Sequence, residues 1–112
     1  MKVMVGDNFL ELEVCQDHEK GLSGRDAVKN DGMVFIYPEP IPLSYHMKDC
    51  NFALDIIFCK EGQVMNVYKD CQPCKSANCQ KYHCESGDLV IELPAGKANE
   101  LCIKRQDLCQ IV

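Results

Sequence analysis

The chain has 112 residues, of which 46% are hydrophobic, and its 12 basic and 17 acidic side chains give a formal net charge of -5. This length allows a single domain with one modest core. The negative charge and the lack of a dense basic cluster make a nucleic-acid partner unfavourable, because phosphate groups would be repelled. The longest apolar stretch, residues 52–59, is interrupted by Asp55 and is much shorter than the about 20 residues of a membrane helix. We therefore expect no membrane association.

Nine cysteines bear on the compartment in which the protein acts. The N-terminal residues MKVMVGDNFLELEV contain no apolar run of signal-peptide length, so we expect the protein in the reducing cytoplasm. An odd number of cysteines leaves at least one thiol unpaired. Four cysteines lie in or beside apolar runs and are predicted to pack as small hydrophobic side chains: Cys15, Cys59, Cys102 and Cys109.

A strand and a short helix are predicted near the N-terminus. Apolar and acidic residues alternate over residues 9–14, which is the period of a strand with one buried face. Asp17 can cap a short helix over residues 18–22, and Gly24 can end it.

Two further strands are predicted around a proline-rich segment. Residues 33–37 form a continuous apolar run, which is typical of a buried strand, and Pro38, Pro40 and Pro42 are expected to stop this strand and change the direction of the chain. Apolar and polar residues alternate again over residues 43–47, which predicts a separate strand.

The second half of the chain predicts a hairpin and then shorter elements. Residues 52–59 and 64–68 flank a hydrophilic link in which Gly62 can adopt a positive φ. The elements that follow are a strand at 89–93, a turn at 94–96, one or two helical turns at 98–103 and a last strand at 108–112. Short strands with frequent turns predict a mainly β fold, either a small antiparallel β-sandwich or a partly closed barrel with one or two short helices.

Four cysteines crowd into the sequence CQPCKSANCQKYHC, which begins at Cys71. Their spacing matches a zinc knuckle. One hypothesis is therefore a zinc ion bound by Cys71, Cys74, Cys79 and Cys84, or by His83 in place of one of these thiolates. A disulfide between Cys74 and Cys79 is a second hypothesis, which requires Cα atoms within about 7 Å. A redox pair of Cys71 and Cys74 is a third, and a loop ordered by its cysteines without any chemistry is the fourth.

Ionisable residues on and after the predicted strand at 43–47 form a second candidate site. They are His46, Lys48, Asp49 and Asp55, and Glu92 on a neighbouring strand could complete the group. Such side chains can hold a small polar ligand or a protein partner through charge-assisted hydrogen bonds. The alternative is a solvent-exposed stripe with a local Lys-Asp pair.

Six short motifs follow one another along the chain: GLSGR at 21–25, GMVFIYPEP at 32–40, MKD at 47–49, LDIIF at 54–58, PC-x4-C-xx-Y at 73–82 and IELPAG at 91–96. Their order and spacing resemble the family called domain of unknown function 192. The resemblance implies a small, mainly β sandwich and brings no established activity with it. The positions that match the family pattern are Lys48, Asp49, Asp55, Cys74, Cys79 and Glu92.

The chain also departs from that family pattern. His46 stands where the pattern has Trp, Asp49 where it has Asn and Ala53 where it has Pro, and the usual Lys-Pro-Gly-Asp turn reads Lys-Arg-Gln-Asp at 104–107. Cys71 and Cys84 lie outside the pattern, so a metal held by them would be specific to this chain.

The sequence contains no nucleophile elbow, no HExxH motif and no glycine-rich phosphate loop, so catalysis is not the leading expectation. We expect a small binding or interaction module without a cofactor. Zinc or thiol redox chemistry in the cysteine-rich segment is the alternative.

Overall fold

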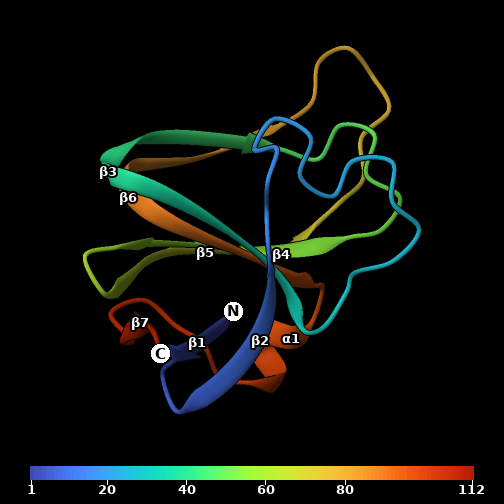
Figure 1. The fold of residues 1–112 in the computed structure, drawn as a ribbon. Coiled ribbons are helices and arrows are strands. Elements are labelled where there is room, and N and C mark those ends of the chain that lie inside the picture. The colour runs from blue at the N-terminus through green and yellow to red at the C-terminus, as the bar shows by residue number, and fades with distance from the viewer.

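In a computed structural model that describes residues 1–112, the chain forms one curled sheet with the strand order β5-β4-β6-β3-β2-β1-β7 (Figure 1). The elements are β1 (Lys2–Val5), β2 (Asn8–Val14), β3 (Gly32–His46), β4 (Leu54–Lys60), β5 (Gln63–Cys71), β6 (Lys81–Pro94), α1 (Lys97–Glu100) and β7 (Cys109–Ile111). The mainly β prediction is confirmed, and the sheet takes the form of a half-barrel. Neighbouring strands are antiparallel except for β2 and β3, which run parallel.

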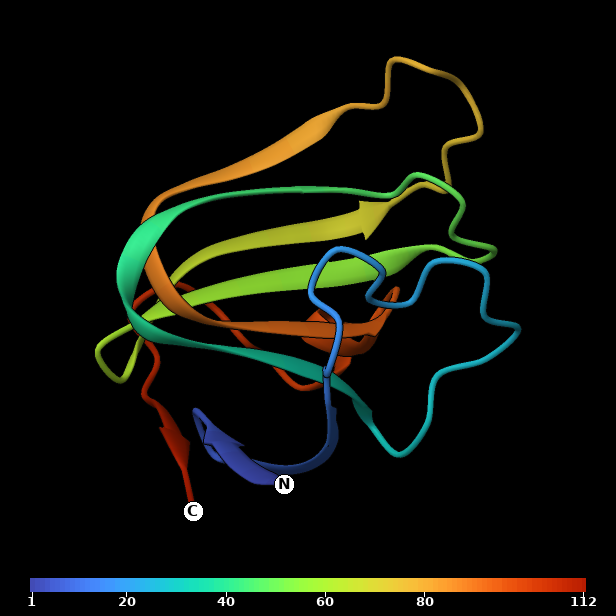
Figure 2. The ribbon, with the colours of Figure 1, turned by 45° about the horizontal axis from the view of Figure 1, so that its top comes forward.

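The two longest strands, β3 and β6, form a bent ribbon that gives the sheet its curvature. Figure 2 shows both strands folding back on themselves at the same side of the molecule. The pairing of β3 with β6 shifts register between Ile36 and Leu43, the segment that holds the three prolines. Proline lacks an amide donor, so it is tolerated where the ladder of hydrogen bonds is already interrupted.

The prediction for the proline segment is therefore half right. The chain does change direction there (Figure 2), but the prolines bend one strand, β3, and do not separate two. One strand, β1, is not predicted by any sequence pattern, and it brings the number of strands in the sheet to seven. β1 lies between β2 and β7, and its four residues are too few to show a pattern.

The hairpin of β4 and β5 is confirmed, because Glu61 and Gly62 form a two-residue turn with φ of 48° and 83°. Two positive φ values match the right-handed twist of a hairpin. The predicted helix at 18–22 is wrong: this segment consists of turns. Asp17 still caps it, since its Oδ1 accepts hydrogen bonds from the amides of Glu19 (3.1 Å) and Lys20 (3.3 Å).

The sheet is buried on both faces, each with its own core. Alternate residues of a strand point to opposite faces, so Ile57 of β4 joins a helix-side core that includes Ala98 of α1. Phe58, the next residue, joins a loop-side core that includes Leu22 and Met47 from the loops. No helix of the chain is long and apolar enough to cross a membrane.

Three of the four cysteines predicted to be packing residues are buried, namely Cys15, Cys59 and Cys109. The prediction is wrong for Cys102, which is exposed. Cys102 has a φ of 56° in the turn that follows α1, and this turn lies at the surface, so its side chain leaves the apolar run.

Candidate binding cleft

The loops that follow β2, β3 and β5 meet at one end of the half-barrel (Figure 1). Backbone hydrogen bonds join them in series. The amide of Gly24 donates to the carbonyl of Asp49 (2.8 Å), the amide of Asp49 donates to the carbonyl of Cys74 (2.9 Å), and the amide of Cys74 donates to the carbonyl of Met47 (3.1 Å). The loops therefore support one another, and those after β2 and β3 form the rim of a cleft.

The cysteine-rich segment does not form the predicted zinc site. Cys74 and Cys79 form a disulfide with Cα atoms 5.8 Å apart, which is the second hypothesis from the sequence and leaves neither sulfur as a thiolate ligand. Cys71 and Cys84 do not lie in the loop, since they are buried on β5 and β6 in the loop-side core. No group of three or more His, Cys, Asp or Glu side chains could hold a metal ion.

The predicted redox pair of Cys71 and Cys74 is also wrong, because Cys74 is joined to Cys79. Burial raises the pKa of the Cys71 thiol to about 11, so this thiol stays protonated at neutral pH. The four cysteines thus divide into a loop disulfide and two core side chains.

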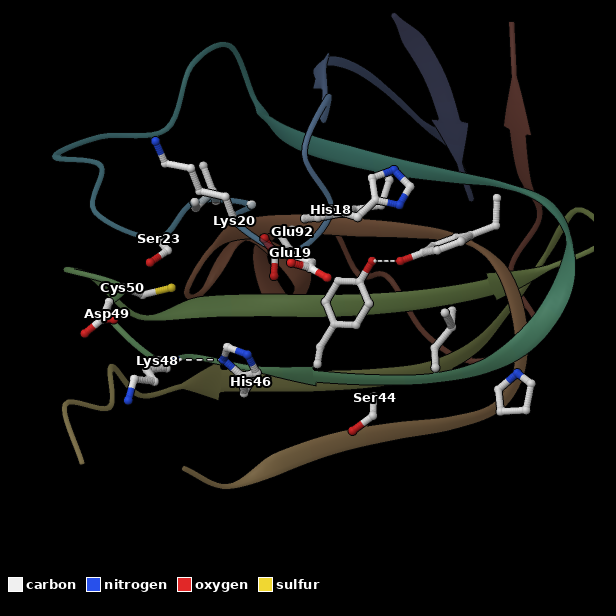
Figure 3. A pocket seen from close by; sticks show the side chains of 17 residues that line it. His18, Glu19, Lys20, Ser23, Ser44, His46, Lys48, Asp49, Cys50 and Glu92 are labelled. Carbon is white, nitrogen blue, oxygen red and sulfur yellow. Dashed lines mark hydrogen bonds between the residues drawn. The ribbon is translucent and has the colours of Figure 1, made fainter. Parts of the chain in front are cut away.

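A cleft of about 660 Å³ opens beneath the rim (Figure 3). Its walls come from the loop after β2, from β3 and the loop after it, and from one residue of β6. The cleft gathers four of the five ionisable residues named from the sequence, which are His46, Lys48, Asp49 and Glu92. Two local features shape the rim: the amide of Lys48 donates to Nδ1 of His46 (3.1 Å), and Asp49 has a φ of 61°.

Glu92 lies at the bottom of the cleft and is only 4% exposed. Its carboxyl group makes no hydrogen bond and no ion pair within the chain. Burial raises the pKa of Glu92 to about 8, because the charged form loses its hydration and gains no partner. In Figure 3 the amino groups of Lys20 and Lys48 point away from Glu92.

Aromatic side chains line the same cleft as this carboxyl group, and the sequence patterns did not reveal them. The ring of Phe35 lies 5.6 Å from that of His18 and 5.1 Å from that of Tyr45, edge to face, and the hydroxyl groups of Tyr37 and Tyr45 share a 2.6 Å hydrogen bond. Burial raises the pKa of both tyrosines, so both stay neutral. Tyr37 and Tyr45 lie on the two arms of the bent β3. No pattern in the sequence predicts that the bend brings them together.

Asp55 is not part of the cleft, contrary to the prediction. It is 1% exposed on the opposite face of the sheet, because its partner on β6 is Leu93 and not Glu92. Its carboxylate accepts hydrogen bonds from the amides of Asp70 (2.9 Å), Gly96 (3.1 Å) and Ala98 (2.8 Å). Asp55 therefore fixes the end of β5 and the start of α1.

Comparisons with known proteins agree with this fold. The family domain of unknown function 192 (DUF192), described as uncharacterized ACR, matches residues 3–111. A protein of unknown function from Novosphingobium aromaticivorans DSM 12444 is 25% identical with a TM-score of 0.84, over 99% of this chain and 84% of that one. A putative transcription regulator from Sinorhizobium meliloti 1021 is 25% identical with a TM-score of 0.77, over 97% and 91% of the two chains. No curated protein matches the chain.

Proposed function

The chain belongs to the DUF192 family, uncharacterized ACR, and we propose that it is a binding module that holds a small polar ligand in the cleft above Glu92. One observation carries this proposal: the Glu92 carboxyl group is almost buried, makes no bond within the chain and keeps its oxygen atoms in contact with the open space of the cleft. Buried polar groups nearly always have a hydrogen-bond partner, because leaving one unpaired costs free energy. A ligand group would supply the missing partner.

The dimensions of the cleft favour a small molecule over a protein partner. Its volume of about 660 Å³ falls within the range of small-molecule sites, roughly 300–1,000 Å³. Glu92 lies below the rim, where a flat protein surface would not reach it. Thiol chemistry has little support, because burial raises the pKa of Cys50, the one thiol that lines the cleft, to about 11.

A screen of small polar metabolites by amide NMR tests this proposal. We expect at least one compound to shift the signals of rim residues such as His46 and Asp49 in the wild-type protein. Glu92→Gln should abolish these shifts, whereas Glu85→Gln, the same change at an exposed position of β6, should retain them. Binding that survives Glu92→Gln, or a broad library that never perturbs the cleft of the folded protein, would contradict the proposal.

We also propose that the protein acts in the cytoplasm, and its unpaired cysteines support this location. Seven cysteines are unpaired, and an oxidising compartment would expose them to incorrect pairing. In a reducing compartment the disulfide between Cys74 and Cys79 would open and close with the redox poise. Trapping the thiols of freshly lysed cells with an alkylating reagent, followed by mass spectrometry, measures the oxidised fraction. A disulfide that is fully closed in the cell would count against the cytoplasm.

A further inference from the structure

We propose that the ligand of this cleft carries one positively charged nitrogen group, an alkylammonium or a guanidinium, on a short apolar stem. This inference rests on the proposed binding function and specifies the chemical class of the ligand. Three features of the cleft support it: the charge at its bottom, the nature of its walls and the approach of the backbone to the carboxyl group.

The one acidic group deep in the cleft has no cation of the chain beside it to balance its ionised form. The ammonium groups of Lys20 and Lys48 point away from Glu92 in Figure 3, and neither forms an ion pair with it. Arg25, on the same loop as Lys20, is held elsewhere by two hydrogen bonds to Glu13, at 2.6 and 2.7 Å. A cationic ligand would therefore meet the Glu92 carboxylate without competition from the chain's own basic groups.

The walls of the cleft suit the rest of such a ligand. Phe35, Tyr37 and Tyr45 line the space beside the carboxyl group, and aromatic rings attract both apolar stems and organic cations. The hydroxyl groups of Tyr37 and Tyr45 are already bonded to each other, so one of their two O–H donors is not available to a neutral, many-hydroxyl ligand. The site thus places one acidic anchor beside an aromatic wall.

Gly21 leaves this carboxyl group uncovered. Its φ is +50°, and a Cβ atom placed there would stand 3.1 Å from Cζ of Phe35 and 3.8 Å from Oε1 of Glu92. A side chain at this position would press on the aromatic wall and occupy space beside the acidic anchor. The glycine therefore keeps open the space that a ligand head group needs.

Binding of a cation predicts a pH dependence with a definite sign. Without a ligand, burial raises the pKa of Glu92 to about 8, and a bound cation favours the ionised form, so complex formation releases a proton below pH 8. If only the ionised form binds, the affinity rises by up to about 90-fold between pH 6 and pH 9. A guanidinium probe keeps its own charge over this interval.

The thiols and phenols that face Glu92 do not explain such a profile. Burial raises the pKa of each neighbouring thiol and phenol, so these groups stay neutral over most of the interval: Cys15, Tyr37, Tyr45, Cys50 and Cys71. The charged groups on the rim are Glu19, Lys20, Lys48 and Asp49, and the two imidazoles are His18 and His46. A control protein with His18→Gln and His46→Gln separates the imidazoles from the carboxyl group.

The test compares n-butylguanidinium with N-butylurea, a neutral probe of nearly the same shape, by calorimetry and amide NMR. We expect the cation to bind at least tenfold more tightly than the urea at pH 8.5. Glu92→Gln should remove this preference, whereas Glu85→Gln should keep both the preference and its rise with pH. For the double histidine variant, whose two residues line the cleft, only the pH profile is compared, and the rise with pH should persist. In wild-type protein at pH 7, the binding enthalpy measured in two buffers should reveal proton release, and this readout needs no variant.

Two results would overturn the cationic class. One is equal binding of the two probes, and the other is an affinity for n-butylguanidinium that does not change between pH 6 and pH 9 and releases no proton. Neither result would contradict the binding function itself, because the metabolite screen tests that function with Glu92→Gln and without regard to ligand charge.

Discussion

Asp55 offers the sharpest test of how this fold is held together. Replacing it by alanine leaves three backbone amides without their acceptor, those of Asp70, Gly96 and Ala98. The amide of Ala98 lies in a buried site and the other two in partly buried ones, where water replaces some of the lost bonding. With about 2 kcal/mol for the buried donor and about 1 kcal/mol for each of the others, Asp55→Ala should lower the free energy of unfolding by about 4 kcal/mol.

Asp55→Asn keeps the shape of the side chain but turns one of its two acceptor oxygens into a donor. We expect an intermediate loss of about 2 kcal/mol. The matched control is Asp88→Ala, because Asp88 also accepts a hydrogen bond from a backbone amide, that of Glu61, but at an exposed turn (3.1 and 3.2 Å to its two oxygens). This control should cost less than about 1 kcal/mol.

Urea denaturation followed by far-UV circular dichroism measures all three variants, provided that the dependence of the free energy on urea concentration stays constant. The expected order of loss is Asp55→Ala, then Asp55→Asn, then Asp88→Ala. If Asp55→Ala costs no more than Asp88→Ala, the three buried hydrogen bonds do not stabilise the fold and the structural role assigned to Asp55 is wrong.

Four further changes have expected outcomes. Burial raises the pKa of Glu92 to about 8. The contribution of this group to stability is therefore fully present below its unfolded pKa and is lost as the pH rises to 8. Glu92→Gln should remove this loss and add up to about 5 kcal/mol to the free energy of unfolding at pH 9, with no gain at pH 4. Changing both Cys74 and Cys79 to serine opens a short disulfide loop and should cost about 2 kcal/mol in urea denaturation under oxidising conditions, an effect that must vanish in reductant. Cys102 is the one exposed free thiol, so the fast phase of thiol labelling should correspond to one group and disappear in Cys102→Ser. Gln106 has a φ of 75°, and Gln106→Gly should raise the free energy of unfolding by about 0.5–1 kcal/mol, whereas an unchanged or lower value would show that the turn holds no strain.

The parts of the fold that could be predicted are those with a local cause. The alternation of residues 9–14 dictates β2, and a glycine in a polar link dictates the hairpin of β4 and β5. The path of β3 could not be read in this way, because prolines end a straight strand but also fit a bent one whose ladder is interrupted. That distinction depends on β6, which bends alongside β3 and comes more than forty residues later.

The sequence predicted most of the ionisable residues of the candidate site but not the aromatic residues that form its walls. His46, Lys48, Asp49 and Glu92 do line one cleft, but Asp55 was wrongly included. The cause is a register shift of one residue: Ile56 pairs with Glu92 and Asp55 with Leu93, which places the two acidic groups on opposite faces of the sheet. A sequence pattern shows which strands carry acidic residues, but the register between distant strands decides which of these residues meet.

The family motifs are distributed between two tasks, and this division explains which departures the fold accepts. Gly24, Asp49 and Cys74 belong to three motifs and join the loops through backbone groups, so the rim can form with different side chains. Asp49 illustrates the point, because at a φ of 61° it replaces the asparagine of the family pattern, and both residues tolerate this conformation. His46, which stands where the pattern has Trp, likewise lies on the rim and not at the bottom of the cleft.

Glu92 has no such freedom: its carboxyl group is the only one buried at the bottom of the cleft, and a glutamine there would keep the shape of the site but remove its charge. Variation on the rim should therefore tune which ligand is preferred, whereas a change at Glu92 should decide whether the ligand is bound at all.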